Sequence, residues 1–160
     1  MATKISEGLI NRQILIVEDQ KATTTDGGGS TAGSWQDRTL NTSVVNNIAG
    51  ASLGSNQVTL PAGTYEVTGF SVSFRTGATQ SRLRDSGDTT TYAISSANYG
   101  DTSDGDNILN TFNGYFTLGS STTLDLQTKA AQAKATDGFG RASDGGEVEI
   151  FSSLKFIKVS

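Results

Sequence analysis

From residue 35 onward the chain is a succession of short segments in which apolar and polar residues alternate, each ending in residues that favour turns. Alternation with a period of two is the pattern of a half-buried β-strand. The longest such segment is Thr64–Arg75, in which the apolar parity changes between Val67 and Phe70. The change falls at Gly69 and predicts a bulge that reverses the inward face of the strand.

The other segments divide the rest of the chain in the same way. They share β-branched or aromatic residues between turns: Trp35–Leu40, Ser43–Ile48, Gln57–Leu60, Arg82–Arg84, Thr90–Ile94, Ile108–Leu118, Thr122–Thr128 and Glu147–Val159. Glycine, serine and threonine supply 60 of the 160 residues, which favours turns over helices. After residue 22 only Lys129–Lys134 has a helix-forming composition. The pattern predicts an all-β protein, a jelly-roll β-sandwich of about eight to ten strands.

The N-terminal region differs from this pattern. Ile14, Leu15, Ile16 and Val17 form a strand-like run that is apolar on both faces. Three consecutive glycines at 27–29 follow it and are costly inside a helix or strand. The sequence therefore predicts an N-terminal arm (1–22), a Gly/Thr linker (23–31) and a jelly-roll domain (32–160). A strand with two apolar faces needs cover on both sides, from its own body or from a neighbouring chain.

The residue types present exclude most kinds of catalytic and metal site. Histidine and cysteine are both absent, which removes Ser-His-Asp triads, cysteine–histidine pairs, the usual zinc sites, iron–sulfur clusters and disulfides. A glycosidase site made of two carboxylates needs a long groove, for which a sandwich of this size has little room. We therefore expect neither enzymatic activity nor a cofactor.

Charge and hydropathy argue against two further classes of partner. Twelve Lys and Arg stand against sixteen Asp and Glu, and no basic run occurs, so we expect no nucleic-acid partner. The longest apolar run is the four residues at 14–17, far short of a membrane span. We accordingly expect no membrane partner.

Several segments, in this order along the chain, resemble a known group of modules. They are Gly33–Asn41, Val58–Tyr65, Arg82–Arg84, Phe116–Leu118 and Thr136–Gly140. Together, over residues 33–159, they resemble the jelly-roll modules of bacteriophage virion proteins, which are similar to the trimeric heads of the complement and tumour-necrosis-factor superfamily. The resemblance implies a jelly roll that assembles as a homotrimer.

Modules of this kind usually end long tail fibres, whereas this sequence has no heptad or shaft repeat, only the arm and the linker. We therefore expect a trimeric capsid cement or decoration protein on the surface of a virion, docked on the major capsid protein by its arm. In this interpretation Ile14, Leu15, Ile16 and Val17 pair with an exposed strand edge of the capsid protein.

The alternative is a receptor-binding module at the tip of a tail fibre or spike, recognising a host surface glycan or protein. Trp35, Tyr92, Tyr99 and Tyr115 are the candidate sugar-stacking residues, although single aromatics in strands more commonly serve the core or an interface.

For each of two loop segments the sequence leaves two roles open. Asp101–Asn107 holds the densest carboxylates, which suit either a calcium site or a solvated loop, and its spacing differs from that of helix–loop–helix calcium sites. The glycine-rich segment Asp137–Glu147 suits either a rim loop that contacts a partner or a packing loop that needs glycine at positive φ.

Overall fold

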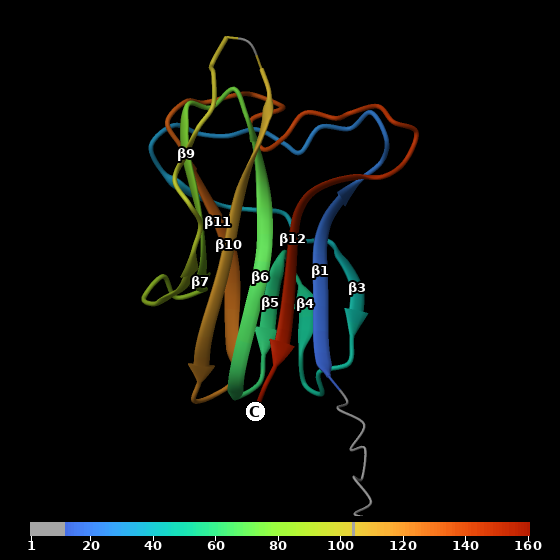
Figure 1. Ribbon diagram of the computed structural model, residues 1–160, viewed down its shortest axis with the longest axis vertical. Helices are drawn as coiled ribbons and strands as arrows, with labels where there is room; N and C mark the ends of the chain where they lie inside the picture. Colours follow the sequence, from blue (N-terminus) through green and yellow to red (C-terminus); the bar gives the residue numbers. More distant parts are fainter. Residues whose placement is uncertain (1–11, 104) are drawn as a thin grey trace, which may run out of the picture.

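The computed structural model describes residues 12–103 and 105–160, which form two antiparallel sheets packed face to face (Figure 1). The described strands are β1 (Gln13–Lys21), β2 (Trp35–Asp37), β3 (Thr42–Asn46), β4 (Ser52–Gly54), β5 (Gln57–Leu60), β6 (Gly63–Phe74), β7 (Ala78–Asp85), β8 (Thr91–Ile94), β9 (Asn98–Tyr99), β10 (Asn107–Leu118), β11 (Thr122–Ala130) and β12 (Glu149–Lys158). The all-β sandwich predicted from the sequence is confirmed. Within the described part of the chain, no helix is long and apolar enough to cross a membrane.

One sheet has five strands in the order β10-β6-β12-β1-β3. The other has seven, in the order β4-β5-β11-β7-β8, with β2 added beside β11 and β9 beside β7. β1 begins and β12 finishes at the same end of the sandwich, which we call the terminus end (Figure 1). The long connections 22–34 and 131–148 cross the opposite end, which we call the loop end.

The expected N-terminal arm is part of the sandwich as far as the structure describes it. β1 pairs with β12 from Gln13 to Lys21 and with β3 from Leu15 to Glu18. The chain's own body thus covers one face of the apolar run, at Leu15 and Val17, and leaves Ile14 and Ile16 half-buried on the other. No boundary separates residues 12–22 from the jelly roll, and residues 1–11 of the expected arm lie outside the described residues.

The expected linker is likewise packed into the fold. The Gly27 amide donates to the Gly140 carbonyl at 2.8 Å, and a Cβ on Gly29 would lie 2.4 Å from the Ala135 carbonyl oxygen. The glycines of this segment are therefore needed for close approach to the 134–140 loop, rather than for flexibility.

The predicted bulge at Gly69 is wrong. β6 pairs with β10 and with β12 without any shift of register at that point. Val72 and Phe74 keep the outward parity of Phe70, but the 137–141 loop covers them and leaves only 6% and 3% of them exposed. The apolar positions of β6 change parity because residues 137–141 cover its outer face at Val72 and Phe74, not because the strand reverses its two faces.

The space between the sheets has two chemically different parts. Toward the terminus end it is apolar and includes Leu15, Val17, Tyr65, Val67, Leu83, Phe112, Phe116, Leu124, Leu126, Leu154 and Phe156. Toward the loop end it is filled by hydrogen-bonded polar side chains, among them Ser71, Ser73, Ser81, Asn110 and Thr128. Burial of each large apolar side chain stabilises the fold by about 1.5–3 kcal/mol, so the terminus half anchors the sandwich.

Candidate binding surface

The four predicted partner-binding residues lie inside a sheet. Leu15 and Val17 point into the core with no exposed surface, while Ile14 and Ile16 are half-buried on the opposite face. Strand addition needs an unpaired edge, and β1 hydrogen-bonds to a strand on each side. The expected docking of this segment by strand pairing is therefore corrected: only the side chains of Ile14 and Ile16 face outward.

These two side chains belong to a broad outer face of the five-stranded sheet. Residues paired across antiparallel strands share a face, so the register defines its rows. One row contains Tyr115, Glu66, Ile157 and Ile14, and the next contains Asn113, Thr68, Lys155, Ile16 and Val45. Each row thus places apolar side chains beside a charged one, and Tyr115 is exposed over 68% of its surface.

The same face is hollowed by two open clefts that meet at Glu66. The larger, of about 590 Å³, lies where β1 begins and β12 finishes, and Arg12 and Lys158 border it. The smaller, of about 330 Å³, lies between β6 and β10 beside Tyr115. A concave surface that mixes apolar side chains with charges of both signs is typical of a protein–protein interface.

An edge of the sandwich next to this face also exposes apolar side chains. β10 is the outermost strand of the five-stranded sheet and contacts β8, the outermost strand of the other. Leu109 and Tyr115 on β10 and Ile94 on β8 are exposed over 54%, 68% and 53% of their surfaces. The sequence analysis missed Leu109 and Ile94, because alternation alone does not show which outward positions lie at an edge.

A buried arginine ties the loop end together. Arg38 has 1% of its surface exposed and donates to the carbonyls of Val72, Phe139 and Phe151 at 2.8, 2.9 and 3.1 Å. Its guanidinium lies 4.2 Å from the centre of the Phe139 ring. Burial lowers the pKa of Arg38 to about 10, and the charge of Asp19 acts in the opposite direction. Three distant segments of the chain are joined by this one side chain.

Asp19 is the acidic counterpart of Arg38. It is fully buried, and its Oδ1 lies 3.0 Å from the Lys21 ammonium. Sequence reasoning missed this pair, but a signal was present: Asp19 follows Leu15 and Val17 at the same parity, so a carboxylate occupies a core position of β1.

The outer face of the seven-stranded sheet carries a polar network around Arg82. Its Nε donates to Gln127 at 2.7 Å, its terminal nitrogen donates to Asp88 at 3.1 Å, and its guanidinium lies 4.2 Å from the centre of the Trp35 ring. These groups satisfy one another, so the network is a stabilised sheet surface.

Asp125 lies within the same face and is 5% exposed. Burial raises the pKa of its carboxyl group, a hydrogen bond from Gln57 at 2.9 Å lowers it, and the nearby charge of Asp37 raises it further. The shift thus follows from desolvation at a sheet surface.

The four aromatic residues considered for sugar binding do not form one surface. Trp35 lies on the seven-stranded sheet, Tyr115 on the outer face of the five-stranded sheet, and Tyr92 packs against Phe116 with ring centres 5.0 Å apart. Tyr99 stands alone in β9 and is exposed over 79% of its surface.

The structure places the two loop segments, 101–107 and 137–147, in different settings. Among residues 12–103 and 105–160, no group of three or more His, Cys, Asp or Glu side chains is placed to hold a metal ion, and Asp104 lies outside this set. In the glycine-rich segment, the amides of Ser143 and Asp144 donate to Glu149 at 3.0 and 2.9 Å. These bonds, that of Ser143 above all, lower the pKa of Glu149. This segment therefore has a packing role at the loop end.

Comparisons with known proteins identify the fold. No family model matches the chain, and no curated protein is significantly similar to it. Among solved structures, the globular domain of zebrafish complement 1qA protein superposes with a TM-score of 0.59 at 13% identity, covering 92% of this chain and 98% of that one. Murine APRIL at pH 5.0 gives a TM-score of 0.60 at 11% identity, covering 92% and 99%. The expected likeness to complement and tumour-necrosis-factor-like jelly rolls is confirmed at the level of the fold.

Proposed function

We propose that the protein is a homotrimeric structural protein of a bacteriophage virion, acting by binding and assembly rather than by catalysis. The observation that carries the proposal is the outer face of the five-stranded sheet, with its two clefts and the exposed edge beside it. A surface of this kind is stabilised when a second copy of the chain covers it.

The arrangement of the apolar groups favours a ring of three. The edge formed by β8 and β10 and the part of the outer face around Ile14 and Ile16 are different patches, because β6 and β12 lie between β10 and β1 in the sheet. A contact between them is head-to-tail and must close by rotation. In the trimer we propose, Leu109, Tyr115 and Ile94 of one copy pack on the face around Ile14 and Ile16 of the next. The two outward isoleucines of the N-terminal run thus keep a partner-binding role, toward a copy of the same chain.

The position of the chain ends supports an orientation in the virion. β1 begins and β12 finishes at the terminus end of the sandwich (Figure 1). We propose that this end faces the particle and that the loop end faces outward. The virion assignment itself rests on the resemblance to phage jelly-roll modules inferred from the sequence over residues 33–159.

The proposal allows two locations in the virion, and they differ in the number of copies of the protein that each particle carries. As a capsid decoration protein, the trimer binds the major capsid protein through its terminus end. As a tail-fibre or spike tip, it presents the loop end to the host, a role favoured by the isolated exposed ring of Tyr99.

Quantitative mass spectrometry of purified particles distinguishes these locations. Hundreds of copies per particle support capsid decoration, and a handful support a fibre tip. Absence of the protein from particles contradicts both.

The self-assembly surface is tested by variants at the edge. Tyr115→Asp places a charge where we expect a contact between copies, and Tyr99→Asp makes the same change at a tyrosine of the loop end that is exposed over 79% of its surface, against 68% for Tyr115. We expect light scattering to show monomers for the first variant and trimers for the second. If both variants remain trimeric, the face and edge described here do not mediate assembly.

A further inference from the structure

A pocket of about 260 Å³ opens on the outer face of the seven-stranded sheet. It lies where β7 begins and β11 finishes, toward the loop end of the sandwich (Figure 1). Its lining includes the small residues Ala78, Ala97 and Ala131 and the polar residues Gln80 and Lys129. Sites for drug-sized ligands measure about 300–1,000 Å³, so this pocket suits a smaller group.

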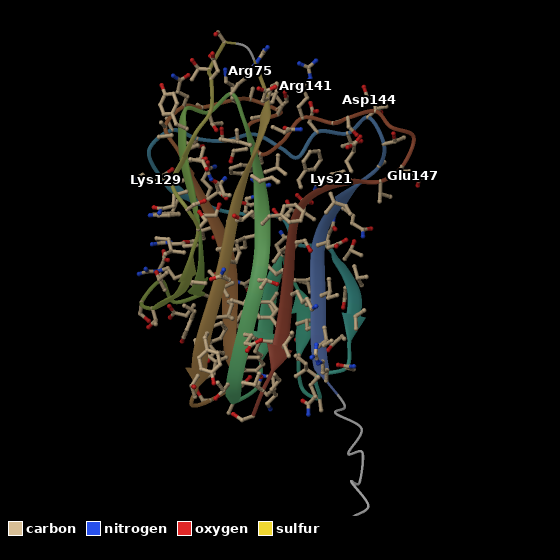
Figure 2. The ribbon with its side chains drawn as sticks, viewed as in Figure 1. Lys21, Arg75, Lys129, Arg141, Asp144 and Glu147 are labelled. Atoms are coloured by element: carbon tan, nitrogen blue, oxygen red, sulfur yellow. The ribbon has the colours of Figure 1, made fainter. Side chains whose placement is uncertain are left out.

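The strand register shows which side chains stand around this pocket. Thr79 of β7 is buried and points inward, so its neighbours Ala78 and Gln80 point outward. Lys129 pairs with Gln80 and Tyr99 pairs with Ala78, and directly paired residues lie on the same face of a sheet. Figure 2 shows Lys129 at the margin of the molecule, nearer the loop end than the terminus end. The outer face therefore brings an ammonium group, an amide and a tyrosine ring to one place.

The ring of Tyr99 stands beside the pocket and is open to solvent. The side chain is exposed over 79% of its surface. Its Cβ lies about 4.5–5.5 Å from that of Ala78, which is the usual spacing of directly paired residues. Trp35 on the same sheet differs, because the guanidinium of Arg82 lies 4.2 Å from the centre of its ring and covers one ring face. Tyr99 thus offers a ligand in the pocket an aromatic face on which the C–H groups of a pyranose can pack.

The polar groups at the pocket define which substituent it can hold. The Nε2 of Gln80 donates to the Ser95 carbonyl at 3.2 Å, which orients the side-chain amide. Within the described part of the chain no hydrogen bond uses the Oε1 of Gln80, so this oxygen can accept one from a ligand. The ammonium of Lys129 is a donor. An acceptor and a donor beside alanine methyl groups match an acetamido group, which has an N–H, a carbonyl and a methyl.

We propose that this pocket binds an N-acetylated sugar, with the acetamido group in the pocket and the pyranose ring stacked on Tyr99. The acetamido N–H donates to Gln80, its carbonyl accepts from Lys129, and its methyl packs on the alanines. The inference goes beyond the function proposed above. Each copy of the chain carries the whole pocket, and the contact proposed between copies uses the outer face of the other sheet and the edge of β8 and β10. The site therefore requires neither the trimer nor the virion location.

The test is an NMR titration of the full chain, labelled at its alanine methyl groups, with diacetylchitobiose. Two probes are titrated in parallel: cellobiose has the same linkage but no acetamido group, and N-methylacetamide has the amide but no ring. We expect diacetylchitobiose to shift the methyl signals of Ala78, Ala97 and Ala131. It should bind about tenfold or more tightly than either probe, because only this sugar makes both the hydrogen bonds and the stacking contact.

Matched variants separate the pocket from general effects of charge and exposed rings. Tyr99→Ala should weaken binding between about twofold and tenfold, whereas Tyr99→Phe keeps the ring and should bind like the parent. Tyr115→Ala removes an exposed tyrosine from the other sheet and should leave the affinity unchanged. Lys129→Met should weaken binding, and Lys155→Met, on the outer face of the five-stranded sheet, should not. The sugar is monovalent, so a change of oligomeric state does not alter the affinity measured per site.

A variant that fills the pocket completes the test. Ala78→Leu should abolish binding while circular dichroism still reports a β-sheet fold. The proposal is overturned if diacetylchitobiose leaves the alanine signals in place, if cellobiose binds as tightly, if Tyr115→Ala weakens binding as much as Tyr99→Ala, or if folded Ala78→Leu binds like the parent. Shifts of the same signals with protein concentration alone would assign the pocket to a contact between copies instead. The mass in solution is measured on the same samples, so failure of the trimer is recognised separately.

Discussion

Arg38 offers the sharpest test of how the loop end is held together. Replacing it with Met keeps much of the side-chain volume but removes the donors to the carbonyls of Val72, Phe139 and Phe151. A buried acceptor left without a partner costs about 1–3 kcal/mol. Removing the cation also leaves the charge of Asp19 less compensated in the core.

Methionine carries no charge, so the variant no longer has to bury a guanidinium group, and this offsets part of the loss. On balance we expect Arg38→Met to lower the free energy of unfolding by about 3–5 kcal/mol. For a domain of this size each kcal/mol shifts Tm by about 2–4 °C, so the expected drop is about 6–20 °C. Chemical denaturation and calorimetry measure both quantities.

The matched control is Arg82→Met, which removes an arginine that also stacks on an aromatic ring but lies on a sheet surface. Its cost should be at most about 1–2 kcal/mol, because water can replace its hydrogen bonds. If the two variants lose equal stability, the role assigned to Arg38 as the tie between three segments is wrong.

Further predictions concern pH, metals and assembly. Glu149 has a lowered pKa, so its stabilisation is present above the unfolded value and lost as the pH falls through the folded one; Glu149→Gln should destabilise the fold at pH 7, and the difference should shrink below about pH 4 in acid-unfolding curves. Asp125 has a raised pKa, so its charge opposes folding at neutral pH; Asp125→Asn should match or exceed the parent's stability at pH 7 and lose any advantage below about pH 4. EDTA should leave Tm unchanged, and a drop of several degrees would restore the calcium interpretation of the 101–107 loop. Ile16→Asp should abolish trimers in light scattering while circular dichroism still reports a β-sheet fold; unchanged trimers would remove this residue from the interface.

The sandwich was predictable because strand alternation and turn chemistry are local properties of the sequence. Thr64–Arg75 was identified as a strand and forms β6 almost over its whole length. Its predicted bulge was wrong, because the cover of Val72 and Phe74 comes from residues 137–141, far away in the sequence. Local pattern reports that a side chain is apolar, but it does not report what covers it.

The N-terminal run illustrates the same limit. The run at 14–17 correctly indicated a strand, and the structure buries one of its two apolar faces. That the chain itself covers this face follows from the pairing of β1 with β12, a contact between segments far apart in the sequence, which the local pattern does not report. The three glycines at 27–29 suggested a flexible linker, because the sequence around them does not show that the 134–140 loop packs against them.

The mass of the unmodified protein in solution tests the central claim most directly. Light scattering during size-exclusion chromatography at micromolar concentration should give three times the chain mass of 16.7 kDa, unchanged on modest dilution. A mass of 16.7 kDa under the same conditions would contradict the account, because the outer face of the five-stranded sheet and the edge formed by β8 and β10 would then remain uncovered.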